Sequence, residues 1–112
     1  MRVMHELSIT QNIVALVSER AEGHRVTRVT IEIGKLNAIV PDAIQFCFGP
    51  CTKGTALEGA QLEIHEIAGR GRCRDCGREL KLTQPYGQCA CGSFHIECIS
   101  GDQMRIKEME VA

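Results

Sequence analysis

Five of the seven cysteines lie between Gly69 and Gly101, and their spacing suits a metal site. Cys73 and Cys76 have two residues between them, so both thiolates can face one ion. Cys89 and Cys91 follow after a gap of 12 residues, with a single residue between them. Four thiolates at such spacing suit tetrahedral Zn(II), and a complete sulfur shell leaves no open position for a substrate. The pattern therefore predicts a structural zinc on these four cysteines.

Two alternatives concern the same cysteines. Cys98 could replace Cys89 if the tight second pair cannot supply both sulfurs. Cys73 and Cys76 could instead form a redox dithiol, but a thioredoxin-like dithiol opens a helix after a strand. The glycines before and after this pair do not resemble that setting.

His5 lies near the start of the chain, between Met4 and Glu6. A histidine near a chain end is most often a solvated side chain. However, an α-amine, a deprotonated amide nitrogen and an imidazole within two residues can form fused chelate rings. Such a square-planar nitrogen field favours Ni(II) or Cu(II).

The segments around these residues carry helix and strand patterns. Ser8 and Gln11 fit a capping box, and apolar residues then recur at helical spacing as far as Ala21. A second, shorter helix is predicted to open at Pro41 and to end at Gly49-Pro50.

Three strands are predicted from the alternation of apolar and polar residues. The first spans 28–33, the second contains Leu62 and Ile64, and the third begins at Met104. The phase of the third strand slips at Lys107-Glu108, which indicates a bulge or a bend.

Together these elements predict an α+β fold, with a small sheet of about three strands packed with two helices. Residues 1–69 and 101–112 would form this domain, which also contains His5. Residues 70–100, rich in cysteine and glycine and poor in aliphatic residues, would form an inserted zinc-ribbon-like module.

Composition limits the function. The chain has 112 residues and a net charge of −1 with acids and bases intermixed, so it offers no basic patch for nucleic acid or an anionic membrane. Its longest apolar run is far too short to span a membrane, and its start does not resemble a signal peptide. We expect a cytoplasmic protein, in which cysteines are more often metal ligands than disulfides.

With these residues in view, the chain resembles the HypA/HybF family of hydrogenase-maturation nickel metallochaperones from Met4 to its C-terminus. The matching motifs are Met4-His5-Glu6-Leu7-Ser8, residues 29–36, Lys53-Gly54-Thr55, the two cysteine pairs with Gly92-Ser93, and the ending from Gly101 to Val111.

The resemblance implies a nickel site centred on His5, with backbone nitrogens of the first residues. Met4 would contribute through its backbone and Glu6 through its backbone or side chain. It also implies a zinc on the two cysteine pairs. The partners implied are a nickel-handling GTPase and the large subunit of a [NiFe]-hydrogenase, and in some members nickel goes to urease maturation. Whether the chain forms a homodimer is left open.

Two features depart from the family pattern. Most members have two residues between the cysteines of the second pair, so Gln88 stands where a ligand would be expected if Cys91 is aligned. Three residues, Met1-Arg2-Val3, precede the Met4 at which the resemblance begins. In the full chain the α-amine is therefore distant from His5 along the backbone.

We expect a nickel carrier rather than an enzyme, because paired carboxylates, an activated nucleophile and a phosphate loop are not recognisable in the sequence. The alternative function is a zinc-ribbon adaptor that binds protein or nucleic acid without nickel transfer. The basic patch and exposed aromatic residues of such adaptors are not evident in the sequence.

Overall fold

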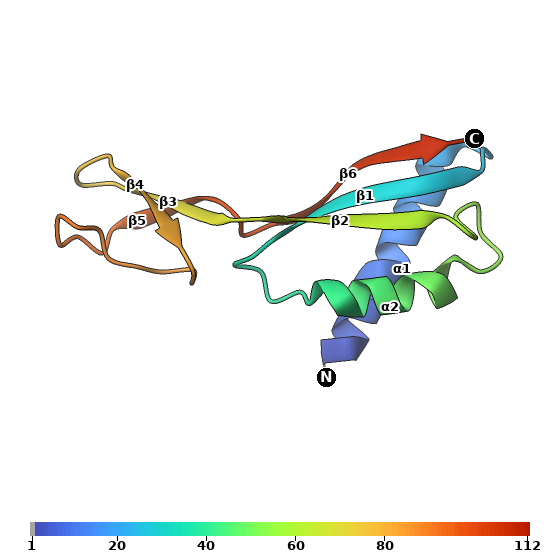
Figure 1. Cartoon of the computed structure of the whole chain (residues 1–112), viewed down its shortest axis with the longest axis horizontal. Coiled ribbons are helices and arrows are strands. Elements are labelled where there is room, and N and C mark those ends of the chain that lie inside the picture. Colours follow the sequence, from blue (N-terminus) through green and yellow to red (C-terminus); the bar gives the residue numbers. More distant parts are fainter. Residues whose placement is uncertain (1) are drawn as a thin grey trace. The chain divides into compact units, whose positions relative to one another are not determined.

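The computed structural model describes residues 2–112, with side chains from His5 onward. These residues form two helices and six strands in the order α1, β1, α2, β2, β3, β4, β5, β6 (Figure 1). Contacts within the chain define two compact units. The first comprises Met1–Ile31, Ile39–Ile64 and Ile106–Ala112, and the second comprises Glu32–Ala38 and His65–Arg105. The predicted α+β fold class is confirmed.

The second unit is larger than the segment 70–100 that composition set apart, because backbone hydrogen bonds tie flanking residues to it. The Lys35 N–H donates to the Ile67 carbonyl and the Leu36 N–H donates to the Gly101 carbonyl, both at 2.8 Å. A Cβ at Gly34 would overlap the carbonyl of Gly101, which itself has a φ of +89°. Only glycine allows the backbones to approach this closely.

Helix α1 spans Arg2–Ala21, so it begins six residues before the predicted cap at Ser8. The capping-box prediction is wrong, and His5 lies inside the helix rather than before it. The reason is tertiary packing, which outweighs a local capping signal. Glu6, in the early part of α1, is buried against other residues of the first unit at 1% exposure.

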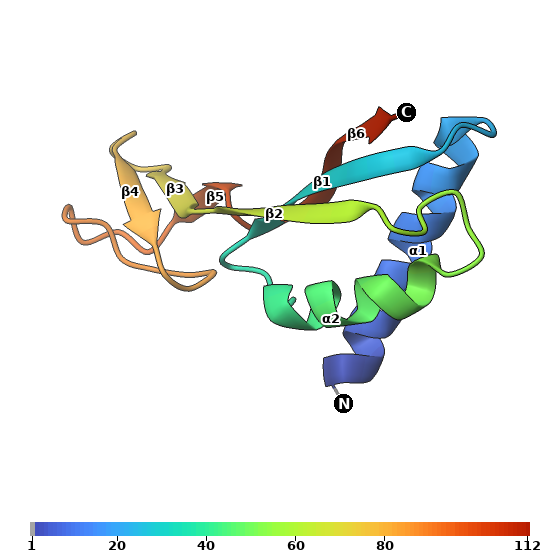
Figure 2. The same ribbon diagram turned by 45° about the vertical axis from the view of Figure 1, so that its right-hand side comes forward.

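The first unit contains most residues of a sheet in the order β2-β1-β6, and both helices lie on one face of that sheet (Figures 1 and 2). Strand β1 spans Val26–Gly34, β2 Gln61–Ile67 and β6 Met104–Val111. The core is aliphatic, as the lack of tryptophan and the few aromatic residues predict. Its most buried side chains come from α1, β1, α2 and the loop after α2, and include Ile13, Val17, Val29, Ile31, Ile44, Phe48 and Leu57.

Helix α2 spans Pro41–Thr52 and continues through Gly49-Pro50, where an end was predicted. Proline removes one backbone donor, but in the last turn this costs only one hydrogen bond. The Thr52 hydroxyl also donates to the Gly49 carbonyl at 2.9 Å, which supports this turn. Cys47 is buried in the core on this helix.

Glu6 joins the two helices of the first unit. Its Oε2 accepts the Val40 N–H at 2.7 Å, at the N-cap of α2, where no side chain of α2 supplies a cap. A carboxylate at this position also interacts favourably with the positive end of the helix dipole. Its other oxygen, Oε1, is buried without a hydrogen-bond partner among the described residues. Glu6 is therefore a buried capping group for α2.

The second unit contains an antiparallel sheet in the order β4-β3-β5. Strand β3 spans Gly69–Cys73, β4 Glu79–Leu82 and β5 Ile96–Ser100. Cys73, the last residue of β3, is opposite Ile96, the first residue of β5. This register places one cysteine at the end of the sheet from which both cysteine-bearing turns extend.

The different burial of two adjacent residues gives a stability prediction. Glu6→Ala should lower the free energy of unfolding by about 1–3 kcal/mol, because it removes a buried side chain and leaves the part-buried Val40 N–H without its acceptor. His5→Ala should change it by no more than about 0.5 kcal/mol, because the His5 side chain is exposed. Urea unfolding of the full chain, followed by circular dichroism at equal metal content, measures both. Equal stability of the two variants would show that Glu6 does not support the fold.

Candidate metal centre

The first cysteine pair is shaped by a turn that follows β3. The Gly77 N–H donates to the Cys73 carbonyl, and the Cys73 N–H donates to the Arg78 carbonyl, each at 2.8 Å. Gly77 has a φ of +77°, a conformation that side chains disfavour. This tight loop turns the Cys73 and Cys76 sulfurs toward a common centre.

The second pair uses a similar loop with one fewer residue between its cysteines. The Gly92 N–H donates to the Cys89 carbonyl and the Cys89 N–H donates to the Ser93 carbonyl, both at 2.8 Å. Gly92, with a φ of +95°, closes the turn. The single-residue gap between Cys89 and Cys91 therefore does not prevent both sulfurs from facing the same point.

The four sulfurs of Cys73, Cys76, Cys89 and Cys91 lie within 4.8 Å of one another. Cys73 Sγ is 3.6 Å from Cys91 Sγ, and Cys76 Sγ is 3.5 Å from Cys89 Sγ. Four sulfurs at about 2.3 Å from a central zinc ion would stand about 3.8 Å apart at the corners of a tetrahedron. The sulfur set thus fits a tetrahedral metal ion such as zinc, and the predicted residues are the ones brought together.

The thiols perturb one another's ionisation. The Cys76 backbone N–H donates to the Cys73 sulfur and is the main cause that lowers the pKa of Cys73 to about 6. The Ser93 backbone N–H acts in the same sense on Cys91, but the neighbouring Cys89 and Cys73 thiols raise the pKa of Cys91 to about 12. The first thiol ionises readily. Ionisation of the remaining thiols is unfavourable next to that negative charge, unless a cation neutralises it.

Cys98 does not join this cluster. Its thiol donates to the Ser100 carbonyl at 3.3 Å, within β5. His95 is also outside the sulfur set, as the sequence suggested. Its Nδ1 lies 3.2 Å from Asp75 Oδ2. The arrangement favours Cys89 over Cys98 as the fourth sulfur.

A polar contact that the sequence analysis missed links the two cysteine loops. Asp75, in the first loop, accepts a hydrogen bond from the Ser93 hydroxyl, which follows the second loop. This bond is the main cause that lowers the pKa of Asp75, and the charge of His95 acts in the same direction. Local spacing identifies Gly92-Ser93 only as a motif, because the hydrogen-bond partner of Ser93 is 18 residues away in the sequence.

The candidate nickel residues lie in the first turns of α1. His5 is exposed, whereas the Glu6 side chain is buried and bonded to Val40. Only the backbone of Met4 is described, as part of α1, and Met1 lies outside the described residues. The helical spacing of Glu6, Thr10, Ile13 and Val17 could have indicated the inward position of Glu6, since these residues share one face.

Two exposed aromatic residues of the second unit were not expected. The side chains of Tyr86 and Phe94 are 72% and 71% exposed. The expectation that exposed aromatic residues are lacking is therefore wrong. Both residues lie in segments without regular structure, where sequence patterns do not predict burial.

Comparison with known proteins extends over nearly the whole chain. Residues 4–111 match the family described as "Hydrogenase/urease nickel incorporation, metallochaperone, hypA". A hydrogenase maturation factor HypA from Nostoc sp. strain PCC 7120 is 61% identical over 108 residues, covering 96% of each chain. The corresponding factor of Geobacter metallireducens is 49% identical over 109 residues, covering 96% of this chain and 99% of its own.

Solved structures agree with this relationship. The solution structure of the Ni metallochaperone HypA from Helicobacter pylori is 25% identical, with a TM-score of 0.68 and coverage of 95% of this chain and 96% of that chain. A second solution structure of a HypA protein is 27% identical, with a TM-score of 0.75 and coverage of 97% of each chain. None of the helices in residues 2–112 is long and apolar enough to cross a membrane.

The family consists of metallochaperones and maturation factors, in agreement with the expectation of a metal-handling protein that is not an enzyme. The cysteine geometry, the fold and the sequence match thus lead to one family. The chain belongs to the HypA family of nickel metallochaperones that act in hydrogenase maturation.

Proposed function

We propose that the chain carries Ni(II) as cargo at its N-terminal segment and holds a structural zinc on Cys73, Cys76, Cys89 and Cys91. The single observation that carries the zinc assignment is the approach of four sulfurs to within 4.8 Å. These sulfurs fill the shell of a tetrahedral ion, so nickel destined for transfer needs a different site.

The loops around the sulfurs have little else to hold them. Cys73, Cys89 and Leu82 are buried in the second unit, but most residues between the two cysteine pairs are exposed. A small module with so little apolar burial gains much of its folding free energy from its metal ion. This is the reason to assign zinc a structural role and not a transferable one.

The nickel site is proposed at His5 with backbone nitrogens of its neighbours. The exposed imidazole can bind and release an ion without disturbing the core. The Met4 amide lies in the first turn of α1, where helix N–H groups lack intrahelical acceptors. The Glu6 carboxylate is already bonded to Val40, which favours its backbone over its side chain as a ligand.

The family supports a role in nickel delivery. The relatives are named hydrogenase maturation factors, and we propose that this chain delivers nickel to the large subunit of a [NiFe]-hydrogenase together with a nickel-handling GTPase. We propose a cytoplasmic location, in keeping with seven free cysteines, including the four that would hold the metal.

The alternative is a zinc-ribbon adaptor that does not transfer nickel. The exposed Tyr86 and Phe94 rings favour it, because exposed aromatic rings are common in binding surfaces. Nickel binding separates the two functions. An adaptor would leave His5 without a role, whereas a carrier requires it.

The zinc assignment predicts different outcomes for two cysteines on the same module. Cys89→Ser should lose the zinc, about one equivalent per chain, because its sulfur is part of the cluster. Cys98→Ser should retain it, because Cys98 donates to Ser100 instead. Elemental analysis of the purified variants measures the zinc content. Retention in the first variant and loss in the second would place Cys98 in the site.

The nickel assignment predicts that His5→Ala abolishes stoichiometric nickel binding while zinc content stays unchanged. The imidazole is the proposed anchor, and the cysteine cluster belongs to the other unit. His24→Ala is the matched control, because His24 is exposed in the turn after α1 and its ring contacts only the Ala21 carbonyl among the bonds described. Calorimetric nickel titration with parallel metal analysis gives the comparison. Unchanged nickel affinity in His5→Ala would favour the adaptor.

A further inference from the structure

Two cations stand opposite each other on the sheet of the second unit. The register of this sheet places Arg70 of β3 opposite Lys81 of β4, and directly opposite residues share one face of a sheet. Both side chains are exposed. Like charges in this position destabilise a sheet, so the pair does not serve the stability of the fold. Positions that break a rule of stability are often functional positions.

Only one carboxylate is paired with these two cations among the described residues. Arg70 Nη2 lies 3.2 Å from Oε1 of Glu79, which precedes Lys81 by two positions on β4. Within the same part of the chain, Lys81 forms no ion pair or side-chain hydrogen bond. The ammonium group of Lys81 is therefore available for an anionic ligand.

Arg72, the next residue on this face of β3, is in the same situation. It lies opposite Glu79 on β4 and Glu97 on β5. Glu79 is paired with Arg70, and Glu97 Oε2 lies 3.9 Å from Arg74 Nε. Arg72 has no ion pair within the described part of the chain. The face thus carries two unpaired cations on neighbouring strands.

A hollow of about 310 Å³ opens beside Arg70 and Lys81. In the described chain β4 pairs only with β3, so the outer side of β4 is a free sheet edge. Half-buried Leu80 contributes an apolar wall to the hollow. The residues that line the hollow are Ala68, Gly69, Arg70, Glu79, Leu80 and Lys81.

This surface fits an extended acidic polypeptide. A free strand edge can bind another strand through backbone hydrogen bonds, and side chains at alternate positions then determine specificity. Arg70 and Arg72 are two positions apart, about 7 Å along β3, which matches the spacing of alternate side chains in an extended segment. Glutamate or aspartate at alternate positions would meet the cations of this face.

Nucleic acid fits the same surface less well. Proteins that bind DNA through its backbone commonly make about 6–10 phosphate contacts. On this face only Arg72 and Lys81 are unpaired among the described residues. The carboxylates of Glu79 and Glu97, on the same face, would repel phosphate groups.

We propose that the face formed by Arg70, Arg72, Glu79 and Lys81 is a docking site for an acidic, extended segment of a partner protein, which adds to the free edge of β4. Arg72 and Lys81 would each gain a carboxylate partner, and the segment would cover Leu80. The proposal is independent of the nickel assignment. It depends on the zinc only through the fold of the second unit.

A short, fluorescently labelled peptide that alternates glutamate and threonine tests the charge requirement. It should bind the zinc-loaded full chain, and binding should weaken as the salt concentration rises. Lys81→Glu removes one attraction and adds one repulsion, so it should raise the dissociation constant on the order of tenfold. Fluorescence anisotropy measures the dissociation constants at equal zinc content.

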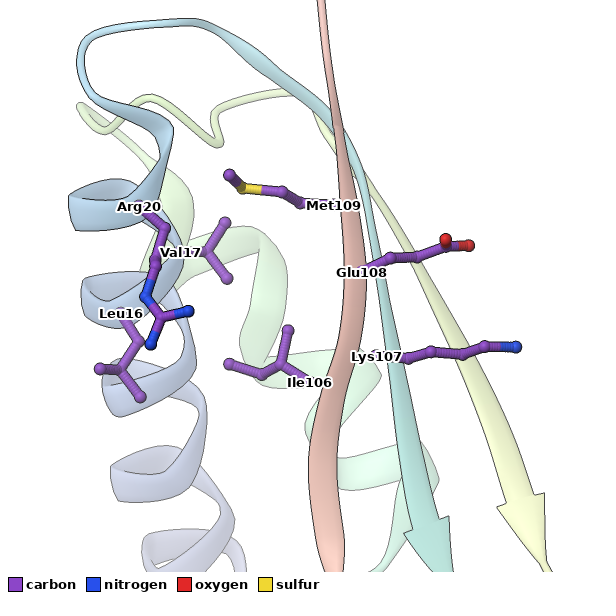
Figure 3. A pocket seen from close by; sticks show the side chains of 7 residues that line it. All are labelled: Leu16, Val17, Arg20, Ile106, Lys107, Glu108 and Met109. Carbon is purple, nitrogen blue, oxygen red and sulfur yellow. The ribbon is translucent and has the colours of Figure 1, made fainter.

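Lys107→Glu is the matched control. Lys107 is an exposed lysine on β6, which pairs only with β1 among the described residues, and its side chain points away from α1 (Figure 3). The variant makes the same charge change at the edge of the other sheet, so peptide binding should not change. If it weakens binding as much as Lys81→Glu does, net charge alone controls binding and the proposal is overturned.

Two further ligands separate strand addition from other modes of binding. The same peptide with proline in place of threonine keeps every carboxylate but loses backbone donors, so it should bind on the order of tenfold more weakly. A single-stranded DNA oligonucleotide at equal concentration should not displace the glutamate peptide. Displacement by DNA, equal binding of the proline peptide, or no binding of the glutamate peptide to the unaltered chain would each overturn the proposal.

Discussion

The close approach of four cysteine sulfurs is the constraint on which the second unit depends. Each loop holds its cysteines by backbone hydrogen bonds and a glycine at positive φ, and each loop contributes two sulfurs. Four thiols within 4.8 Å of one another cannot all ionise without a cation, because their negative charges repel one another. This conflict is seen in the pKa of Cys91, which its neighbouring thiols raise to about 12. The proposed zinc ion would resolve the conflict and join the two loops, which share few apolar contacts.

The first unit is stabilised by its core and by a buried carboxylate, not by a cysteine cluster. Its aliphatic core holds α1 and α2 on one face of a sheet, and the buried Glu6 carboxylate caps α2. His5 and Glu6 are adjacent in sequence but have opposite environments, one exposed and one buried. In the proposed function, His5 would bind the transferable ion while the neighbouring Glu6 fixes α1 against α2. Stability and metal exchange would then rely on different side chains.

Much of the fold follows from local signals, and the exceptions have physical reasons. Strand alternation in β1 and β2, the phase slip in β6 and the end of α1 near Gly23 were predictable because they depend on neighbouring residues. The start of α1 was not, because contacts between Glu6 and Val40, 34 residues apart, extend the helix past its capping signal. Similarly, α2 continues through Pro50 because only one hydrogen bond is lost there.

Some features of the candidate sites also follow from local sequence, and others do not. The cysteine cluster was predictable because ligand spacing is a local property, and even the tight pair Cys89 and Cys91 reaches the common centre. The Asp75–Ser93 hydrogen bond and the inward direction of Glu6 depend on three-dimensional placement. The roles of Met4, His5 and Glu6 rest on the family resemblance and on the chemistry of amide and imidazole nitrogens.

The central claim is that two chemically distinct metal sites exist, with sulfur ligands for zinc and nitrogen or oxygen ligands for nickel. X-ray absorption at both the zinc and the nickel edges, on one sample loaded with both ions, tests it most directly. The zinc edge should show four sulfurs at about 2.3 Å, and the nickel edge should show only nitrogen or oxygen neighbours. Sulfur around nickel, or mainly nitrogen and oxygen around zinc, would contradict the separation of the two sites.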